Sequence, residues 1–135
     1  MLNGKVKVQM SNRTAIIVSD DRRSLRDLEE ILGASDHDLV VINNALLAVD
    51  TVVRNKPGVV LLELRMPRKN GFEIADEINY ALESKKMPII AMSSVYRKEF
   101  GFLFNLCGIN GHLKKPFRPL DVMWAIENVT KEAIV

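Results

Sequence analysis

The sequence predicts a doubly wound α/β sandwich, in which a five-stranded parallel sheet carries helices on both faces. Short apolar runs alternate five times with longer segments of helical type. The runs are apolar throughout, as expected of parallel strands that are buried on both faces. Short connections between the segments favour repeated strand–helix units. With 135 residues, 47% of them hydrophobic, the chain fits one domain with one core.

We expect a polar tail over residues 1–12 and one domain over residues 13–135. Runs rich in Val and Ile favour extended structure within that domain. The expected strands lie near 14–18, 39–42, 59–62, 88–92 and 110–113. The fifth run fits the description of a buried strand least well.

Glycine and proline mark the ends of the first two expected helices. The first lies near 22–32 and should stop at Gly33, because glycine is common just beyond a helix. The second lies near 44–55 and stops before Pro57-Gly58. Both helices therefore return to the next strand through short connections.

Apolar stripes and breakers mark the last three expected helices. The fourth runs from about 95 to 107 and ends at Gly108. The third begins at Gly71, and its stripe consists of Phe72, Ala75, Ile78, Ala81 and Leu82. The fifth follows Pro119, a residue suited to a first helical turn. Its stripe consists of Val122, Ala125, Ile126, Val129 and Ala133.

Bulk composition argues against several classes of function. The net charge of +2 gives no argument for nucleic-acid binding by this domain. The single cysteine, Cys107, excludes an intrachain disulfide and a multi-cysteine metal site. No apolar run approaches the roughly 18 residues of a membrane span, and residues 1–12 lack a signal-type apolar segment. We therefore expect a cytoplasmic protein that does not associate with membranes.

Chemically active side chains follow the expected strands where each strand ends. Asp20 and Asp21 follow the first strand, Glu63 the third, Ser93 the fourth and Lys115 the fifth. Ligands of doubly wound sheets bind beyond the carboxyl ends of the strands. The fold alone therefore gathers these residues at one edge.

Three carboxylates and a lysine at one edge are suited to handling a phosphoryl group. Crowded carboxylates require a cation, protonation or hydrogen bonds. Mg²⁺ prefers carboxylate oxygens and can hold a phosphoryl group during transfer. A lysine ammonium and a serine hydroxyl can both donate to phosphate oxygens. A divalent cation such as Mg²⁺ is therefore one way to compensate this edge, although no cofactor is certain from the sequence.

The order and spacing of these residues resemble the receiver domain of bacterial two-component response regulators, which has a flavodoxin-like fold. The resemblance covers about residues 13–131. It implies a phosphorelay signalling module rather than an enzyme, with a histidine kinase as one expected partner. The positions that it implies are Asp20 and Asp21 for the acidic pair, Glu63 for the phosphoacceptor, Ser93 and His112 for the switch, Lys115 for phosphate contact, and Lys115-Pro116 for a cis peptide.

The chain departs from the family at the phosphoacceptor, where receivers carry aspartate. Glu63 places its carboxylate one carbon–carbon bond, about 1.5 Å, further out. Mg²⁺ requires near-ideal geometry, and in-line transfer requires similar positioning. We therefore expect Glu63 not to be phosphorylated in the usual way, and Mg²⁺ at Asp21 and Glu63 to bind weakly or not at all. Two interpretations stay open: an inactive site, or a partial mimic of the phosphorylated state in which Glu63 reaches toward Ser93 and Lys115.

Two further departures concern Arg22 and His112. Arg22 stands where receivers usually carry an acidic or small polar residue. It or Arg65 could replace the metal through bidentate bonds to carboxylates, or both could be solvated. His112 stands where receivers usually carry Tyr or Phe, whose ring moves with the switch hydroxyl. Histidine is smaller and can charge near neutral pH, so it either alters that coupling or has no switching role.

The fourth helix is apolar around much of its circumference, although a helix on a sheet needs one apolar stripe. Trp124 also lies off the main stripe of the fifth helix. We therefore expect the fourth helix, fifth strand and fifth helix to bind a protein partner or a second copy, as in the family. The alternative is that Phe102, Leu106 and Trp124 complete the core.

Two other function classes share this architecture. Phosphotransferases and phosphatases with an aspartate nucleophile resemble a pattern of two aspartates separated by one residue, whereas Asp20 and Asp21 are adjacent. A flavin or nucleotide binder needs a Gly- or Ser/Thr-rich phosphate loop, whereas residues 19–24 are charged and lack glycine. The sequence therefore favours an atypical receiver domain over both.

Overall fold

The computed structural model describes residues 12–83 and 86–130 of the chain. Of the polar tail predicted over residues 1–12, only Asn12 lies within these ranges, and Ala133 lies outside them. Strands and helices alternate along the described residues. The predicted α/β fold class is confirmed.

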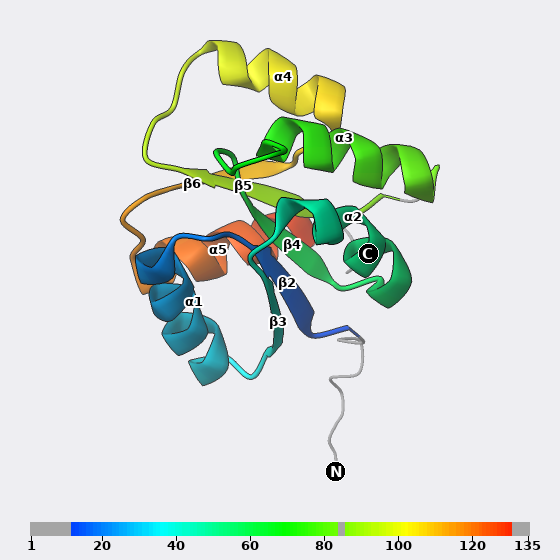
Figure 1. The fold of residues 1–135 in the computed structure, drawn as a ribbon. Helices are drawn as coiled ribbons and strands as arrows, with labels where there is room; N and C mark the ends of the chain where they lie inside the picture. The colour runs from blue at the N-terminus through cyan, green and yellow to red at the C-terminus, as the bar shows by residue number, and fades with distance from the viewer. Residues whose placement is uncertain (1–11, 84–85, 131–135) are drawn as a thin grey trace.

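The strands of the described residues form one parallel sheet, as predicted. Their order across the sheet is β3-β2-β4-β5-β6, which Figure 1 shows. The chain therefore changes its direction of travel between β2 and β4, and this switch point is where doubly wound sheets bind ligands. The strands are β2 Thr14–Val18, β3 Asp38–Ile42, β4 Val59–Glu63, β5 Ile89–Ser93 and β6 Gly111–Lys114.

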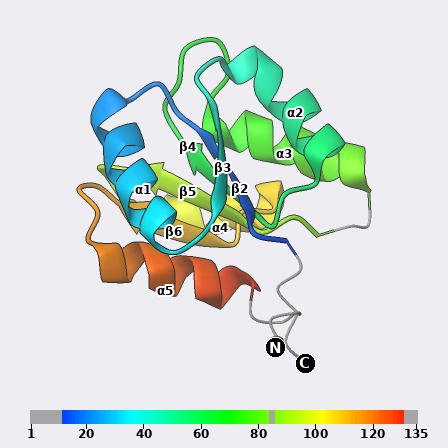
Figure 2. The same ribbon diagram turned by 90° about the horizontal axis from the view of Figure 1, so that it is seen from below.

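Helices cover both faces of the sheet. α1 and α5 lie on one face, and α2, α3 and α4 cover the other (Figures 1 and 2). A short 3-10 helix, η2, precedes α2. Within residues 12–83 and 86–130, no helix is long and apolar enough to cross a membrane. The bounds are α1 Arg22–Ala34, η2 Ala45–Leu47, α2 Ala48–Asn55, α3 Gly71–Leu82, α4 Glu99–Cys107 and α5 Pro119–Thr130.

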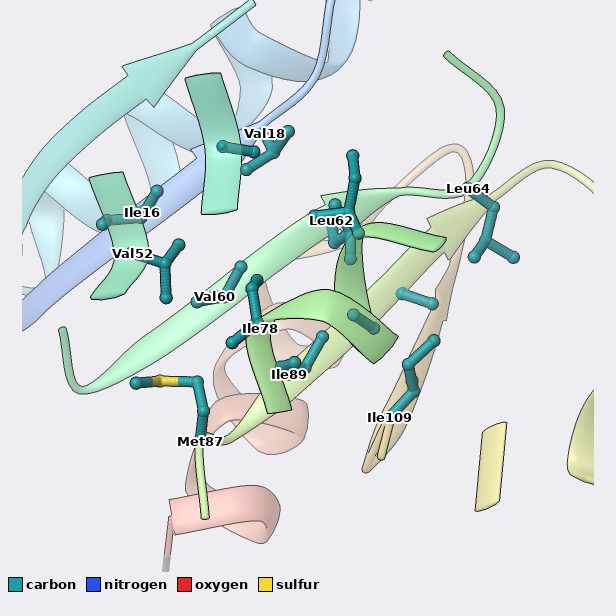
Figure 3. Close-up of a cluster of buried hydrophobic side chains, with 14 of the residues drawn as sticks. Ile16, Val18, Val52, Val60, Leu62, Leu64, Ile78, Met87, Ile89 and Ile109 are labelled. Atoms are coloured by element: carbon teal, nitrogen blue, oxygen red, sulfur yellow. The ribbon is translucent and has the colours of Figure 1, made fainter. Parts of the chain in front are cut away.

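Two apolar cores hold the helices to the sheet, because successive strand residues point to opposite faces. Ile16, Val18 and Val60 pack beneath α2, α3 and α4, in the core that Figure 3 shows. Ala15 and Ile17 point the other way, toward α1 and α5. Burial on both faces explains why the strand runs are apolar throughout.

The first helix does not end at Gly33, so that prediction is wrong. α1 continues to Ala34, and Ser35 caps it with a hydroxyl that donates to the Leu32 carbonyl at 3.0 Å. The left-handed conformation that a helix-ending glycine would adopt belongs instead to Asp36, with φ of 68°. Aspartate tolerates this conformation better than most residues because its side chain is short and polar.

The fourth helix begins at Glu99, later than the predicted start near residue 95. Residues 94–98 form the loop that leaves β5. The hydroxyl of Ser93 donates to the carbonyl of Val95 in this loop. A side chain that bonds to a nearby carbonyl competes with helix formation, and this explains the later start.

The third helix begins where predicted, but its apolar stripe differs in part. Ile74 is buried, whereas the predicted stripe residue Ala81 is exposed. Asn70 and Glu73 form a capping box at its start: Asn70 Oδ1 accepts from the Glu73 N–H at 2.9 Å, and Glu73 Oε1 accepts from the Asn70 N–H at 3.0 Å. The box fixes where α3 begins.

Candidate functional site

Four strands bring the predicted site residues to their carboxyl edge. Glu63 and Ser93 are the last residues of β4 and β5, rather than the first residues beyond them. Asp21 caps the N-terminus of α1 at the end of the short connection from β2. Lys115 follows β6, and the Lys115-Pro116 peptide is cis, as predicted.

Lys115 joins two carboxylates that come from different strands. Its Nζ donates to Asp21 Oδ2 at 2.7 Å and to Glu63 Oε2 at 2.7 Å. Burial lowers the pKa of Lys115, but the hydrogen bonds to Asp21 and Glu63 outweigh it and raise that pKa above its ordinary value. The ammonium therefore stays charged and donates a hydrogen bond to each of the two acids.

Asp21 has two roles in this site. As the cap of α1, its Oδ1 accepts from the Arg23 N–H at 3.2 Å. Its Oδ2 accepts from the Ser24 hydroxyl at 2.8 Å as well as from Lys115. Lys115 first, and then Ser24, lower the pKa of Asp21 to about 2. Asp21 is therefore a permanently charged partner for the lysine at neutral pH.

Ser19 is a site residue that the sequence analysis missed. It is fully buried. Its hydroxyl donates to Glu63 Oε1 at 3.0 Å and accepts from the Asp21 N–H at 3.1 Å. The available signal was a hydroxyl residue at the end of an otherwise apolar run, directly before the acidic pair.

Ser93 and His112 form a second network beside the first. His112 Nε2 lies 3.0 Å from Ser93 Oγ. Because the Ser93 proton goes to the Val95 carbonyl, the histidine must donate through Nε2. Burial and then Lys114 lower the pKa of His112, which favours a neutral ring. The ring stacks on Phe104, with 6.0 Å between centroids.

Three further candidates from the sequence lie on the surface. Asp20, Arg22 and Arg65 are exposed. Within residues 12–83 and 86–130, neither arginine forms an ion pair with a carboxylate. Asp20 and Arg65 line an open pocket of about 550 Å³ that Glu63 and Lys115 also line. The described geometry therefore gives the charge-compensating role to Lys115 and not to an arginine.

The arrangement does not fit a divalent cation as it stands. The ammonium of Lys115 lies between the carboxylates of Asp21 and Glu63, which are the two predicted ligands. In the described part of the chain, no three His, Cys, Asp or Glu side chains lie close enough together to hold a metal. A cation would have to displace the lysine from both acids.

Comparison with known proteins relates the chain to response regulators. The sequence model of the response regulator receiver domain matches residues 15–127. The chain is 21% identical over 126 residues to the response regulator Rcp1 of Synechocystis sp., covering 87% of this chain and 86% of that protein. It is 28% identical over 117 residues to the transcriptional regulatory protein PdtaR of Mycobacterium tuberculosis, covering 85% of this chain and 55% of that protein.

Solved structures show the same fold. The chemotaxis protein CheY4 of Vibrio cholerae is similar with a TM-score of 0.81 and 18% identity, covering 88% of this chain and 99% of that chain. The receiver domain of the sensor histidine kinase PA1611 from Pseudomonas aeruginosa has a TM-score of 0.79 and 19% identity, covering 90% of this chain and 99% of that chain. That protein holds a magnesium ion in its active-site cleft.

Proposed function

The chain belongs to the family of response regulator receiver domains, and we propose that it is an atypical member whose Glu63 does not accept a phosphoryl group. Receiver domains of two-component systems are signalling modules that interact with histidine kinases and other proteins. The proposed difference lies in how this site is used and not in the fold that carries it.

The state of the Glu63 carboxylate carries the proposal. Glu63 is 6% exposed, and its two oxygens are held by Ser19 and Lys115. A nucleophile must present an oxygen in line with the incoming phosphorus. A longer carboxylate whose oxygens already accept hydrogen bonds from two sides is poorly placed to do so.

Glu63 could also act as a partial mimic of the phosphorylated state, which requires contacts with both Lys115 and Ser93. Glu63 bonds to Lys115, whereas the hydroxyl of Ser93 bonds to Val95 and His112. This difference favours a site that is fixed in one state over a mimic that engages the switch.

Acceptance of a phosphoryl group can be tested by intact mass after incubation with acetyl phosphate and Mg²⁺. We expect no stable adduct on the wild type and a measurable adduct on Glu63→Asp. Glu63→Gln serves as the control that removes the carboxylate. A stable adduct of one phosphate on the wild type, mapped to Glu63, would contradict the proposal.

We further propose that the α4–β6–α5 face binds a protein partner or a second copy of the chain. Large side chains on this face are exposed: Phe102 by 67%, Leu106 by 62% and Trp124 by 67%. Their exposure argues against the alternative in which these three side chains complete the core. Exposed apolar groups that gather on one face mark contact surfaces.

The contact face can be tested by sedimentation of Phe102→Glu and Trp124→Glu beside Tyr80→Glu. Tyr80 is 86% exposed on α3 and is the matched control. Phe100 is less suitable for this test, because its ring packs on Phe72 with 5.6 Å between centroids. The proposal would be wrong if all three variants and the wild type self-associate equally and also bind a partner equally.

A further inference from the structure

Ser19 is a fully buried hydroxyl at the base of the site. It follows β2, and β2 pairs with β4 in a register where Val18 lies opposite Leu62. The next residues along these two strands are Ser19 and Glu63, so backbone pairing brings them side by side. The hydroxyl donates to Glu63 Oε1 at 3.0 Å.

The two ends of the Glu63 carboxylate are held by different groups. The Ser19 hydroxyl donates to Oε1 at 3.0 Å, and Lys115 Nζ donates to Oε2 at 2.7 Å. The Ser19 oxygen is itself fixed, because it accepts from the Asp21 N–H at 3.1 Å. Its one proton is therefore directed at Glu63, and the hydrogen bond depends on how far that side chain reaches.

We propose that Ser19 is a positioning residue matched to glutamate at position 63. An aspartate there would end about 1.5 Å earlier, which is enough to break a hydrogen bond of ordinary length. The Ser19 hydroxyl would then be buried without its acceptor. The inference rests on the proposed function, because it explains how the site accommodates the longer acid.

The pairing predicts that the cost of Glu63→Asp depends on Ser19. In the wild-type background, the substitution shortens the acid and also leaves the buried Ser19 hydroxyl without its acceptor. In the Ser19→Ala background, it only shortens the acid. Any role of Ser19 in packing alone would change both backgrounds equally and would cancel in the comparison.

A double-mutant cycle measures this dependence. The unfolding equilibrium constant is determined by urea titration for the wild type, Ser19→Ala, Glu63→Asp and the double variant. We expect Glu63→Asp to raise that constant about tenfold more in the wild type than in Ser19→Ala, which corresponds to about 1.4 kcal/mol. A ratio below about twofold, within the additivity of independent sites, would overturn the inference.

Ser24→Ala provides the matched control. Ser24 is also buried, and its hydroxyl donates to Asp21 Oδ2 at 2.8 Å without touching Glu63. The Ser24→Ala, Glu63→Asp cycle should stay within about twofold. If Ser24 is coupled to Glu63 as strongly as Ser19 is, the coupling is a general response of the acidic site. The proposed specific pairing of Ser19 with Glu63 would then be wrong.

A second measurement requires no substitution at position 63. The hydroxyl proton of Ser19 should exchange slowly enough to be observed by NMR in the wild type, with a cross-peak to the Glu63 side chain. Absence of this signal in a spectrum that resolves other buried hydroxyl protons would contradict the pairing. Phosphorylation of Glu63 is measured separately by mass, so failure of the proposed function leaves both of these readouts intact.

Discussion

Replacement of Lys115 by methionine should destabilise the protein strongly, because Lys115 pairs with both Asp21 and Glu63. Methionine keeps an apolar side chain of similar length and removes the ammonium. The variant then leaves Glu63, whose side chain is 7% exposed, without its ion-pair partner. Asp21, whose side chain is 37% exposed, loses the same partner.

Two contributions set the size of the effect. Removing one partner of a buried ion pair costs about 3–5 kcal/mol, and the lower end applies here because Ser19 still donates to Glu63. The pKa of Asp21 falls from 3.8 to about 2, but its exposure to solvent reduces the corresponding stabilisation to about 1 kcal/mol. We therefore expect a loss of about 4 kcal/mol at pH 7.

The loss should depend on pH in a defined direction. A carboxyl whose pKa is lowered on folding stabilises the folded state above its ordinary pKa, and this contribution disappears as the pH falls through the lowered value. For Asp21 the window lies between pH 3.8 and about 2. The stability difference between the wild type and Lys115→Met should therefore narrow as the pH falls through this window.

Urea titration followed by circular dichroism at a series of pH values measures these differences. Lys114→Met is the matched control, because Lys114 is exposed and makes no ion pair within the described residues. The control should lie within about 0.5 kcal/mol of the wild type. If Lys115→Met loses no more stability than Lys114→Met at pH 7, the assigned role of the lysine is wrong.

Three further predictions concern the metal and the helices around the site. Mg²⁺ at low millimolar concentration should give no saturable rise in melting temperature, because we expect it to bind weakly or not at all. Tight binding would be easy to detect by differential scanning fluorimetry, since a hundredfold excess over Kd would stabilise the wild type by about 2.7 kcal/mol. Such a rise would contradict the prediction. Gly108→Ala should cost about 1–3 kcal/mol in a urea titration, because φ is 78° and an added Cβ would lie 2.3 Å from Asn79 Nδ2. Gly33→Ala, where an added Cβ meets nothing within 4 Å, is its control and should cost nothing. Asn70→Ala should cost about 1 kcal/mol by removing the capping box of α3, and an unchanged unfolding midpoint would show that the box contributes little.

The fold could be predicted from the sequence because each strand is buried on two faces. That burial produces continuous apolar runs, such as Ala15 to Val18, and such runs are hard to mistake for a surface helix. Helix ends were less predictable. Gly33 suggested a stop, but the chain leaves the helix through Ser35 and Asp36, whose side chains and backbone offer an equally good exit.

The site could be predicted only as far as backbone topology determines it. Parallel strands place their ends together, so the meeting of Asp21, Glu63 and Lys115 followed from the sheet. Side-chain direction did not follow. Ser19 was counted only as part of the charged segment 19–24, and Ser93 could have faced either Glu63 or Val95. Which partner such a hydroxyl takes depends on competition between nearby hydrogen-bond acceptors, and the spacing of residues in the sequence does not show the outcome.

The side chains of the site form two separate hydrogen-bond networks, and this bears on how the site could influence the proposed α4–β6–α5 contact face. One network joins Glu63 to Ser19, Lys115 and Asp21, and the other joins Ser93 to His112 and Val95. Across the described ranges, no hydrogen bond between side chains connects the two networks. The backbone does join the two networks, because the Lys115 N–H donates to the Ser93 carbonyl at 2.9 Å. For the side chains to couple as well, Ser93 would have to release Val95, and that change requires a ligand with different affinity for the two arrangements. Lys115 already donates to both Asp21 and Glu63, so a cation that could drive this change finds both acids occupied. This favours the proposal that the α4–β6–α5 face is presented permanently.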